Sequence, residues 1–152
     1  MGDTIRIANC SGYYGDRLDA AREMVTGGPI DVLTGDYLAE LTMKILYDQR
    51  EQRGAHLGYV GTFLKQAEDV VALCLEKGIK IVTNAGGLNP AGMATEVERI
   101  LEAQGLSARV AYIDGDDLTP HLADYQADGE PFVNLDKGTR LAESDNEVVT
   151  AN

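Results

Sequence analysis

The sequence has 152 residues, with no tryptophan, only two cysteines and two histidines, and few basic side chains. The two cysteines, Cys10 and Cys74, build no disulfide framework and form no C-x-x-C metal pair. No run approaches the roughly 18 consecutive apolar residues that a membrane-spanning helix needs. No cationic start followed by an apolar stretch marks a secretory signal. We therefore expect a cytoplasmic protein that does not enter a membrane.

Acidic side chains outnumber basic ones, 25 against 13, and the net charge is −12. Affinity for nucleic acid comes largely from basic side chains at phosphates, so this balance argues against nucleic acid as a partner. The imbalance grows after Ile113, because residues 114–152 hold 10 acids and 2 bases. We predict a core domain over residues 1–117 and an irregular acidic extension over residues 118–152.

Short apolar runs alternate with amphipathic stretches in the first 113 residues. The runs predict strands at residues 4–8, 30–34, 80–83 and 108–113. The amphipathic stretches predict helices at residues 19–25, from Asp36 onward with Leu38, Leu41 and Ile45 on one face, at residues 60–74, and from Pro90 to Gly105. This alternation is typical of βαβ units. It predicts an α/β fold with an open, mostly parallel, doubly wound (Rossmann-like) sheet. After Asp117 only residues 132–135 and 147–150 resemble short strands.

Small and polar residues follow every predicted strand. Ligands of open parallel sheets bind outside the carboxyl ends of the strands, so we expect the four loops to converge on one site. The candidate ligand-binding residues are Asn9, Ser11, Gly12, Tyr14, Gly15, Asp16 and Arg17 in the first loop, Gly35 in the second, Asn84, Gly86, Gly87 and Asn89 in the third, and Gly115 and Asp117 in the fourth.

Asp36 and Asp116 are the candidate catalytic residues, because a carboxylate at the site can move a proton. Asp36 follows a glycine at a predicted helix start, so a helix N-cap is the alternative interpretation. Asp116 and Asp117 could hold a divalent cation. Adjacent carboxylates on a loop are more often solvated, and we predict no metal site.

The glycine-rich first and third loops could cradle an anion through free backbone N–H groups. The alternative for the first loop is a tight turn in which Asp16 caps the following helix. Arg17 could bind a phosphate or carboxylate, or could pair with Asp16 or Asp19 as ordinary surface charge. No spacing ties a histidine to Cys10, so a partly buried thiol is favoured over a nucleophile. Cys74, on the apolar face of a helix, is predicted to be core.

Five segments together resemble the acyclic terpene utilisation (AtuA-type) family. They are IANCSGYYGDR at residues 7–17, GPIDVLTGDYLAELT at 28–42, TNAGGLNP at 83–90, GDDL at 115–118 and VTAN at 149–152. The resemblance spans essentially the whole chain, with Cys10 as a departure where the family pattern favours a small residue. It implies that the chain is the N-terminal part of a longer protein, and the apolar end of the sequence agrees with this expectation.

The resemblance implies a role in the breakdown of acyclic terpenes of the citronellol and geraniol type, which proceeds through CoA thioesters. We expect a small-molecule ligand, either a CoA thioester or a branched acid, and a lyase- or hydratase-type reaction if the chain is an enzyme. The alternative is a non-catalytic subunit that binds an acyl-CoA or nucleotide. Such a subunit would assemble with a partner enzyme such as an acyl-CoA carboxylase. For the chain itself we expect either a homo-oligomer or a partner enzyme subunit. Neither the residues nor the resemblance identifies a cofactor.

Overall fold

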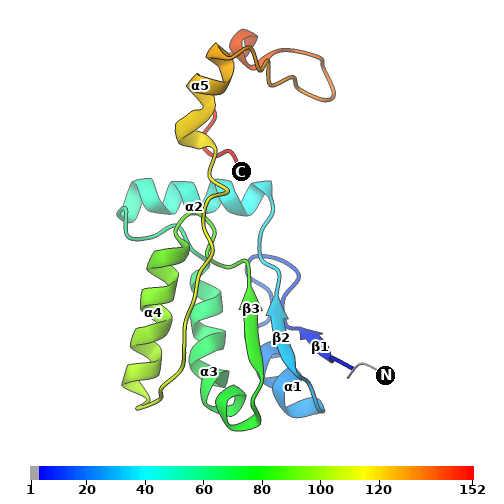
Figure 1. The fold of residues 1–152 in the computed structure, drawn as a ribbon, viewed down its shortest axis with the longest axis vertical. Helices are drawn as coiled ribbons and strands as arrows, with labels where there is room; N and C mark the ends of the chain where they lie inside the picture. The colour runs from blue at the N-terminus through cyan, green and yellow to red at the C-terminus, as the bar shows by residue number, and fades with distance from the viewer. Residues whose placement is uncertain (1–3) are drawn as a thin grey trace. The chain divides into compact units, whose positions relative to one another are not determined.

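A computed structural model describes residues 4–152, and the chain divides into two compact units, Met1–Ile113 and Asp114–Asn152. Within residues 4–113, the first unit contains three strands and four helices (Figure 1). They are β1 (Ile7–Asn9), α1 (Ala20–Gly27), β2 (Val32–Gly35), α2 (Glu40–Arg53), α3 (Gly61–Lys77), β3 (Lys80–Thr83) and α4 (Pro90–Ala103). No helix within residues 4–152 combines the length and the apolar character needed to cross a lipid bilayer.

The three strands form an open parallel sheet in the order β1-β2-β3. Its register places Asn9 opposite Thr34, and Thr34 opposite Val82. The carboxyl ends of all three strands therefore lie at one edge of the sheet (Figure 1). The predicted α/β class with a parallel sheet is confirmed.

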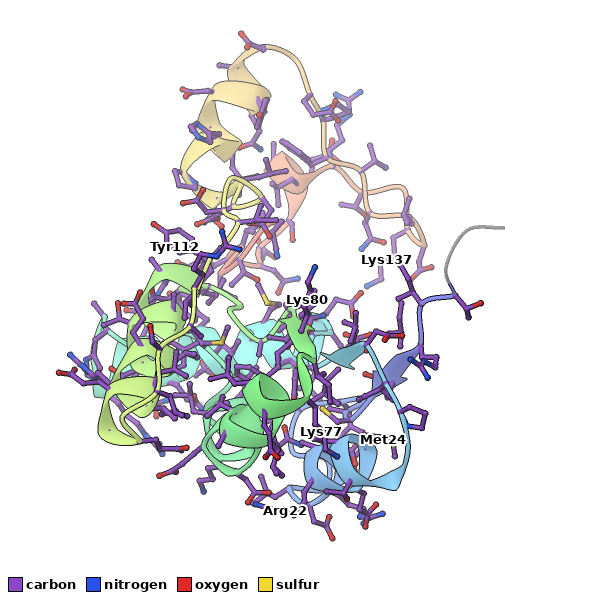
Figure 2. All side chains as sticks on the ribbon, turned by 60° about the horizontal axis from the view of Figure 1, so that its bottom comes forward. Arg22, Met24, Lys77, Lys80, Tyr112 and Lys137 are labelled. Carbon is purple, nitrogen blue, oxygen red and sulfur yellow. The ribbon has the colours of Figure 1, made fainter. Side chains whose placement is uncertain are left out.

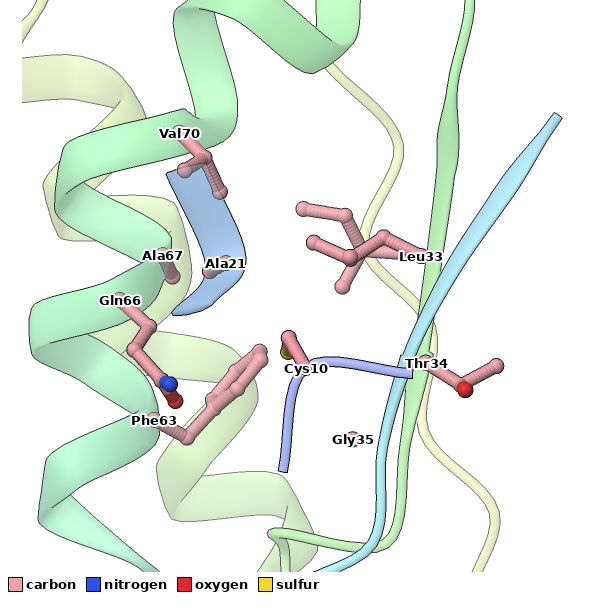
Figure 3. A pocket seen from close by; sticks show the side chains of 10 residues that line it. Cys10, Ala21, Leu33, Thr34, Gly35, Phe63, Gln66, Ala67 and Val70 are labelled. Atoms are coloured by element: carbon pink, nitrogen blue, oxygen red, sulfur yellow. The ribbon is translucent and has the colours of Figure 1, made fainter. Parts of the chain in front are cut away.

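Helices α1 and α3 pack on the same face of this sheet. Figure 3 shows Ala21 of α1 and Val70 of α3 on the side toward which Leu33 points. Strand order here follows chain order, and right-handed crossovers between such strands place every connecting helix on one face. The opposite face leaves Ile7 65% and Val82 58% exposed. The doubly wound part of the prediction, with helices on both faces, is not confirmed within residues 4–152.

Polar contacts join α1 to α3 beside their apolar packing. The Arg22 guanidinium donates from Nε to Asp69 Oδ2 at 2.8 Å, and Lys77 Nζ donates to the Val25 carbonyl oxygen at 2.7 Å. Figure 2 labels Arg22 and Met24 on α1 and Lys77 at the end of α3. The first unit therefore has a fixed helical layer behind its sheet.

Helix α2 differs from its prediction in both its start and its face. It begins at Glu40, after an extended Ala39, rather than at Asp36. Its buried residues are Thr42, Met43 and Leu46, whereas Leu41 is 72% exposed. Leu38 lies before the helix, and Leu41 and Ile45 are not among its buried residues, so the predicted spacing of these three did not identify the buried side.

Helices α3 and α4 and strand β3 follow the sequence pattern closely. Gly78 ends α3 in a left-handed conformation with φ of 68°, and its N–H donates to the Leu75 carbonyl oxygen at 3.2 Å. Pro90 is the first residue of α4, a position where its missing N–H removes no helical bond. Residues 80–83 form β3 as predicted.

The fourth predicted strand, residues 108–113, is not a strand in the structure. Val110 packs against the core cluster behind the sheet, while Ile113 is 93% exposed. A strand needs a hydrogen-bonded neighbour, and this stretch has none within residues 4–152. Apolar alternation alone therefore misled the prediction.

The second unit holds two 3₁₀ turns and one short helix, α5 (Leu122–Ala127). Its segments are tied by the Leu118 N–H, which donates to the Ala151 carbonyl oxygen at 2.7 Å, and by a single bridge between Val133 and Arg140. The strands predicted at residues 132–135 and 147–150 are absent from this described unit. None of its residues is fully buried.

Candidate functional site

The first and second strand-end loops are joined by backbone hydrogen bonds. The Cys10 N–H donates to the Thr34 carbonyl oxygen at 2.8 Å, and the Asp36 N–H donates to the Ser11 carbonyl oxygen at 3.0 Å. These bonds continue the β1–β2 pairing beyond the last strand residues. They hold the start of the first loop against the residues that follow β2.

The third loop is joined to the second through the side chain of Asn84. Asn84 Nδ2 donates to Asp36 Oδ1 at 2.7 Å, and Asn84 Oδ1 accepts the Tyr37 N–H at 2.9 Å. Thr83 Oγ1 also donates to the Gly35 carbonyl oxygen at 2.9 Å. One asparagine thus fixes both the carboxylate and the backbone of the neighbouring loop.

Asn9 and Thr34 add a second pair of polar side chains at the carboxyl edge of the sheet. Its Nδ2 donates to the Ser11 carbonyl oxygen at 2.8 Å, and its Oδ1 accepts from Thr34 Oγ1 at 3.3 Å. We call Asn9, Thr34, Asp36 and Asn84 the rim. Asn9, Asp36 and Asn84 are exposed, so the rim presents their polar groups to solvent.

Residues 5–152 match the sequence pattern of the acyclic terpene utilisation family protein AtuA. The chain belongs to this family. Comparison with curated proteins and with solved structures gives no significant match. The family's name associates it with the utilisation of acyclic terpenes. The matched span includes every rim residue and extends over both structural units from residue 5 onward.

Asp36 is not a helix N-cap in this family member, so that interpretation was wrong. Helix α2 begins four residues later, with Ala39 at the N-cap position. The Asp36 carboxylate instead lies at the rim, with one oxygen bonded to Asn84. The other interpretation, an acid or base at the site, stays a prediction.

Asp16 occupies the first loop in the way that a bound anion would. Its carboxylate accepts the Gly12 N–H at 3.0 Å and the Arg17 N–H at 2.7 Å. These two backbone donors hold the pKa of Asp16 below its usual value. Asp16 therefore closes its own loop rather than capping α1, whose N-cap is Asp19. Gly15, with φ of 89°, allows the loop to turn back on itself.

Arg17 is paired with acids of its own surface. Its guanidinium bonds to Asp19 from Nε at 3.1 Å and also contacts Glu23. The hydrogen bond with Asp19, followed by that with Glu23, raises the pKa of Arg17 further above its usual value. The surface-charge interpretation, pairing with Asp19, is the one that the structure shows.

The third loop uses its backbone N–H groups internally. Those of Gly87 and Asn89 donate to carbonyl oxygens of Asn84 and Gly86 at 3.3 and 2.9 Å. The Asn89 side chain accepts the Gly92 N–H at 2.9 Å, which caps α4, and donates to the His56 carbonyl oxygen at 3.0 Å. This predicted anion cradle is thus largely occupied by the chain itself.

Glycine is required at two positions of the site because a Cβ there would clash with neighbouring atoms. A Cβ on Gly87, whose φ is 51°, would lie 2.4 Å from Leu46 Cδ1 and 2.8 Å from the Gly58 carbonyl oxygen. A Cβ on Gly35 would lie 2.6 Å from the ring of Tyr37. Both glycines therefore allow close packing beneath the rim, and their role is structural.

Buried polar side chains next to the rim residues form a hydrogen-bonded network. The Tyr37 hydroxyl, in a residue 1% exposed, donates to Gln66 Oε1, and Gln66 Nε2 donates to the Arg17 carbonyl oxygen at 3.0 Å. The Cys10 Sγ lies 4.0 Å from the Tyr37 hydroxyl oxygen. Burial raises the pKa of Tyr37 and of the Cys10 thiol. Cys10 is thus the buried, unactivated thiol that the sequence favoured.

Cys74, Ser11 and Tyr14 also have structural surroundings. Cys74 is 2% exposed, as predicted, and burial raises the pKa of its thiol to about 11. Ser11 is 2% exposed, and its hydroxyl donates to the Tyr13 carbonyl oxygen at 3.0 Å. The Tyr14 hydroxyl accepts from Gln49 Nε2 at 3.0 Å. Neither Ser11 nor Tyr14 adds a polar group to the rim.

A small cavity lies behind the sheet, among Cys10, Leu33, Phe63 and Gln66 (Figure 3). Its volume of about 10 Å³ is that of one water molecule at most. It contains none of the exposed rim residues Asn9, Asp36 and Asn84. Any ligand of the rim therefore binds at the surface of the sheet edge rather than in this cavity.

Gly115, Asp116 and Asp117 belong to the second unit, and their part in the predicted convergence stays a prediction. All three residues are exposed, and Asp117 Oδ1 accepts the Thr119 N–H at 2.9 Å. Within residues 4–152, no cluster of three or more His, Cys, Asp or Glu side chains is arranged to hold a metal ion.

Sequence reasoning missed Thr34, Tyr37 and Gln66. Thr34 and Tyr37 lie directly beside the predicted site residues Gly35 and Asp36. Their position next to this pair was the signal in the sequence that could have identified them. Gln66 is a polar residue on the otherwise apolar face of α3, and it is 2% exposed. A buried polar side chain requires a partner, which is the physical signal that could have identified it.

Proposed function

We propose that this chain acts in acyclic terpene breakdown by binding a small intermediate at the rim. The observation that carries the proposal is the hydrogen-bonded convergence of the three strand-end loops, with exposed Asn9, Asp36 and Asn84. The membership in the acyclic terpene utilisation family supplies the chemical context. Ligands of open parallel sheets bind at this edge, which supports the same location.

The proposed ligand is a CoA thioester of a branched acid. An asparagine side chain has two N–H donors, and one of those on Asn84 is used by Asp36. The other donor can bind a neutral carbonyl oxygen such as that of a thioester. The first and third loops do not favour the CoA phosphates, because Asp16 and internal carbonyl oxygens already take their N–H groups.

Binding without catalysis is the alternative that one observation favours. A carboxylate that moves protons at neutral pH is usually buried, which raises its pKa toward the working pH. Asp36 and Asp116 are both exposed. A non-catalytic subunit that holds an acyl-CoA and assembles with a partner enzyme such as an acyl-CoA carboxylase would need no such burial.

Thermal denaturation with isovaleryl-CoA as the probe tests the proposal, since a ligand that binds only the folded state raises the melting temperature. We expect a concentration-dependent rise for the wild-type chain, and a smaller one for free CoA. Asn84→Ala removes the carbonyl donor, and we expect it to abolish the difference between the two probes. Asn146→Ala, an exposed change in the second unit, is the matched control. No rise with isovaleryl-CoA at millimolar concentration would overturn the proposal.

The reaction class is tested separately with Asp36→Asn, whose amide oxygen can still accept the Asn84 N–H. In a lyase or hydratase, Asp36 would move a proton, so this variant would bind isovaleryl-CoA normally and lose turnover of a matching unsaturated thioester. In a binding subunit, the wild-type chain shows no turnover at all.

A further inference from the structure

The polar groups that remain unused at the rim are of two kinds. Asp36 bonds to Asn84 through Oδ1, which leaves Oδ2 to accept a hydrogen bond from a ligand. Asn9 and Asn84 each use one N–H of their side-chain amides, toward the Ser11 carbonyl oxygen and Asp36. Each amide retains a second N–H donor. The rim therefore offers one charged acceptor beside two neutral donors.

The groups that would favour an anion are engaged elsewhere. The Arg17 guanidinium is shared between Asp19 and Glu23. The Gly12 and Arg17 N–H groups are bound by the Asp16 carboxylate. No cationic side chain belongs to the rim, and Asp36 contributes a negative charge to it. A carboxylate or phosphate placed there would meet like charge without a counter-ion.

We infer that the rim holds a neutral hydroxyl group, which donates to Asp36 Oδ2 and accepts the free N–H of Asn9, while that of Asn84 binds the thioester carbonyl oxygen. Asn9 Nδ2 and the Asp36 N–H both donate to the Ser11 carbonyl oxygen, so these two residues lie close together. Asp36 is then a specificity-determining residue that excludes carboxylates and phosphates from this position. The inference rests on the proposed function, because it names the chemical group that the same site selects. A hydroxyl satisfies both kinds of unused rim group, whereas a carboxylate satisfies only the donors.

The size of the discrimination follows from the exposure of Asp36. In water, the repulsion between two like unit charges about 4 Å apart lowers the affinity of the charged ligand roughly fivefold. Where the ligand excludes water, the repulsion lowers the affinity further. We therefore expect an alcohol to bind about five- to tenfold more tightly than the corresponding acid. Salt screens exposed charges, so the ratio should fall at 0.5 M NaCl.

Citronellol and citronellic acid form a suitable probe pair, since they differ at the head group and the acid is ionised at pH 7.5. Dissociation constants are measured by NMR titration of the wild-type chain, of Asp36→Asn, and of Glu76→Gln. The last variant removes one negative charge from an exposed position on α3 and is the control. We expect a five- to tenfold preference for citronellol in the wild type and the control, and a preference below twofold in Asp36→Asn.

Equal or tighter binding of citronellic acid to the wild type overturns the inference, as does an unchanged preference in Asp36→Asn. Failure of both probes to bind also overturns it. If neither probe binds but isovaleryl-CoA still raises the melting temperature, the proposed function is retained and only the inference is rejected. Failure of isovaleryl-CoA while the alcohol preference is found would reject the thioester and retain the hydroxyl site.

Discussion

Asn84 and Asp36, 48 residues apart in the chain, are joined side chain to side chain by a hydrogen bond of 2.7 Å. The same asparagine accepts the Tyr37 N–H at 2.9 Å. Two loops that follow neighbouring strands are thereby fixed to one another at the carboxyl edge of the sheet. The carboxyl ends of parallel strands generally lie together, and here the Asn84 side chain also fixes the polar groups that follow two of them.

Replacing Asn84 should therefore destabilise the chain as well as alter the rim. Asn84→Ala removes a bond to a carboxylate and a bond to a backbone N–H. The first bond is exposed and the second is half-buried, so we expect a loss of about 1–2 kcal/mol in the free energy of unfolding. Urea unfolding followed by circular dichroism measures this. Asn146→Ala should unfold like the wild type, and equal stability of the two variants would show that the Asn84 bonds contribute nothing.

Gly87 is predicted to tolerate no side chain. Gly87→Ala would bring a Cβ within 2.4 Å of Leu46 Cδ1 at a residue with φ of 51°. We expect a loss of about 2–4 kcal/mol in unfolding free energy, from backbone strain and displacement of a core leucine. Gly27→Ala, at the end of α1 with nothing within 4 Å of the new Cβ, should be neutral or slightly stabilising. Similar melting temperatures for the two variants would contradict this.

Tyr37→Phe tests the network below the rim. The variant keeps the ring that packs edge-on against Phe63, with ring centroids 6.0 Å apart, but leaves Gln66 Oε1 buried without its donor. An unpaired buried acceptor costs about 1–3 kcal/mol, so a loss of this size is expected. Tyr13→Phe, at a tyrosine that is 61% exposed, is the control and should change stability by less than about 0.5 kcal/mol.

Asp16 should make stability fall in acid. Its folded-state pKa is held below the usual value by the Gly12 and Arg17 N–H groups, so the unfolded state binds the proton more readily. The stabilisation is complete above the unfolded pKa, near 4, and is lost as the pH falls through the lower folded pKa. Asp16→Asn should reduce the decline in urea midpoint between pH 5 and pH 2.5. An unchanged decline would assign it to other acids, such as Asp31 and Asp69, whose pKa values are also lowered.

The sequence predicted the elements whose signals are local. The apolar stripe over residues 60–74 placed α3, Pro90 placed the start of α4, and residues 80–83 placed β3. The convergence of three strand-end loops followed from the general rule for parallel sheets. These predictions do not depend on knowing which elements pack against each other.

The errors concern partners that local patterns do not encode. Asp36 resembled an N-cap because a glycine precedes it, but the side chain that bonds to it comes from Asn84. Residues 108–113 have the alternation of a strand, yet no neighbour in the described chain pairs with them. Gln66 is polar on an apolar helix face, and only the fold shows that Tyr37 is its partner. Long-range polar pairing is thus the part that a single sequence left undetermined.

The most direct test of the central claim is a ¹H–¹⁵N NMR titration of the chain with citronellol, which reports where a ligand contacts the protein. We expect chemical-shift changes centred on the backbone amides of Asn9, Asp36 and Asn84 and on the side-chain amides of the two asparagines. Changes that avoid these three residues, or that gather at the cavity around Phe63 and Gln66, would contradict it.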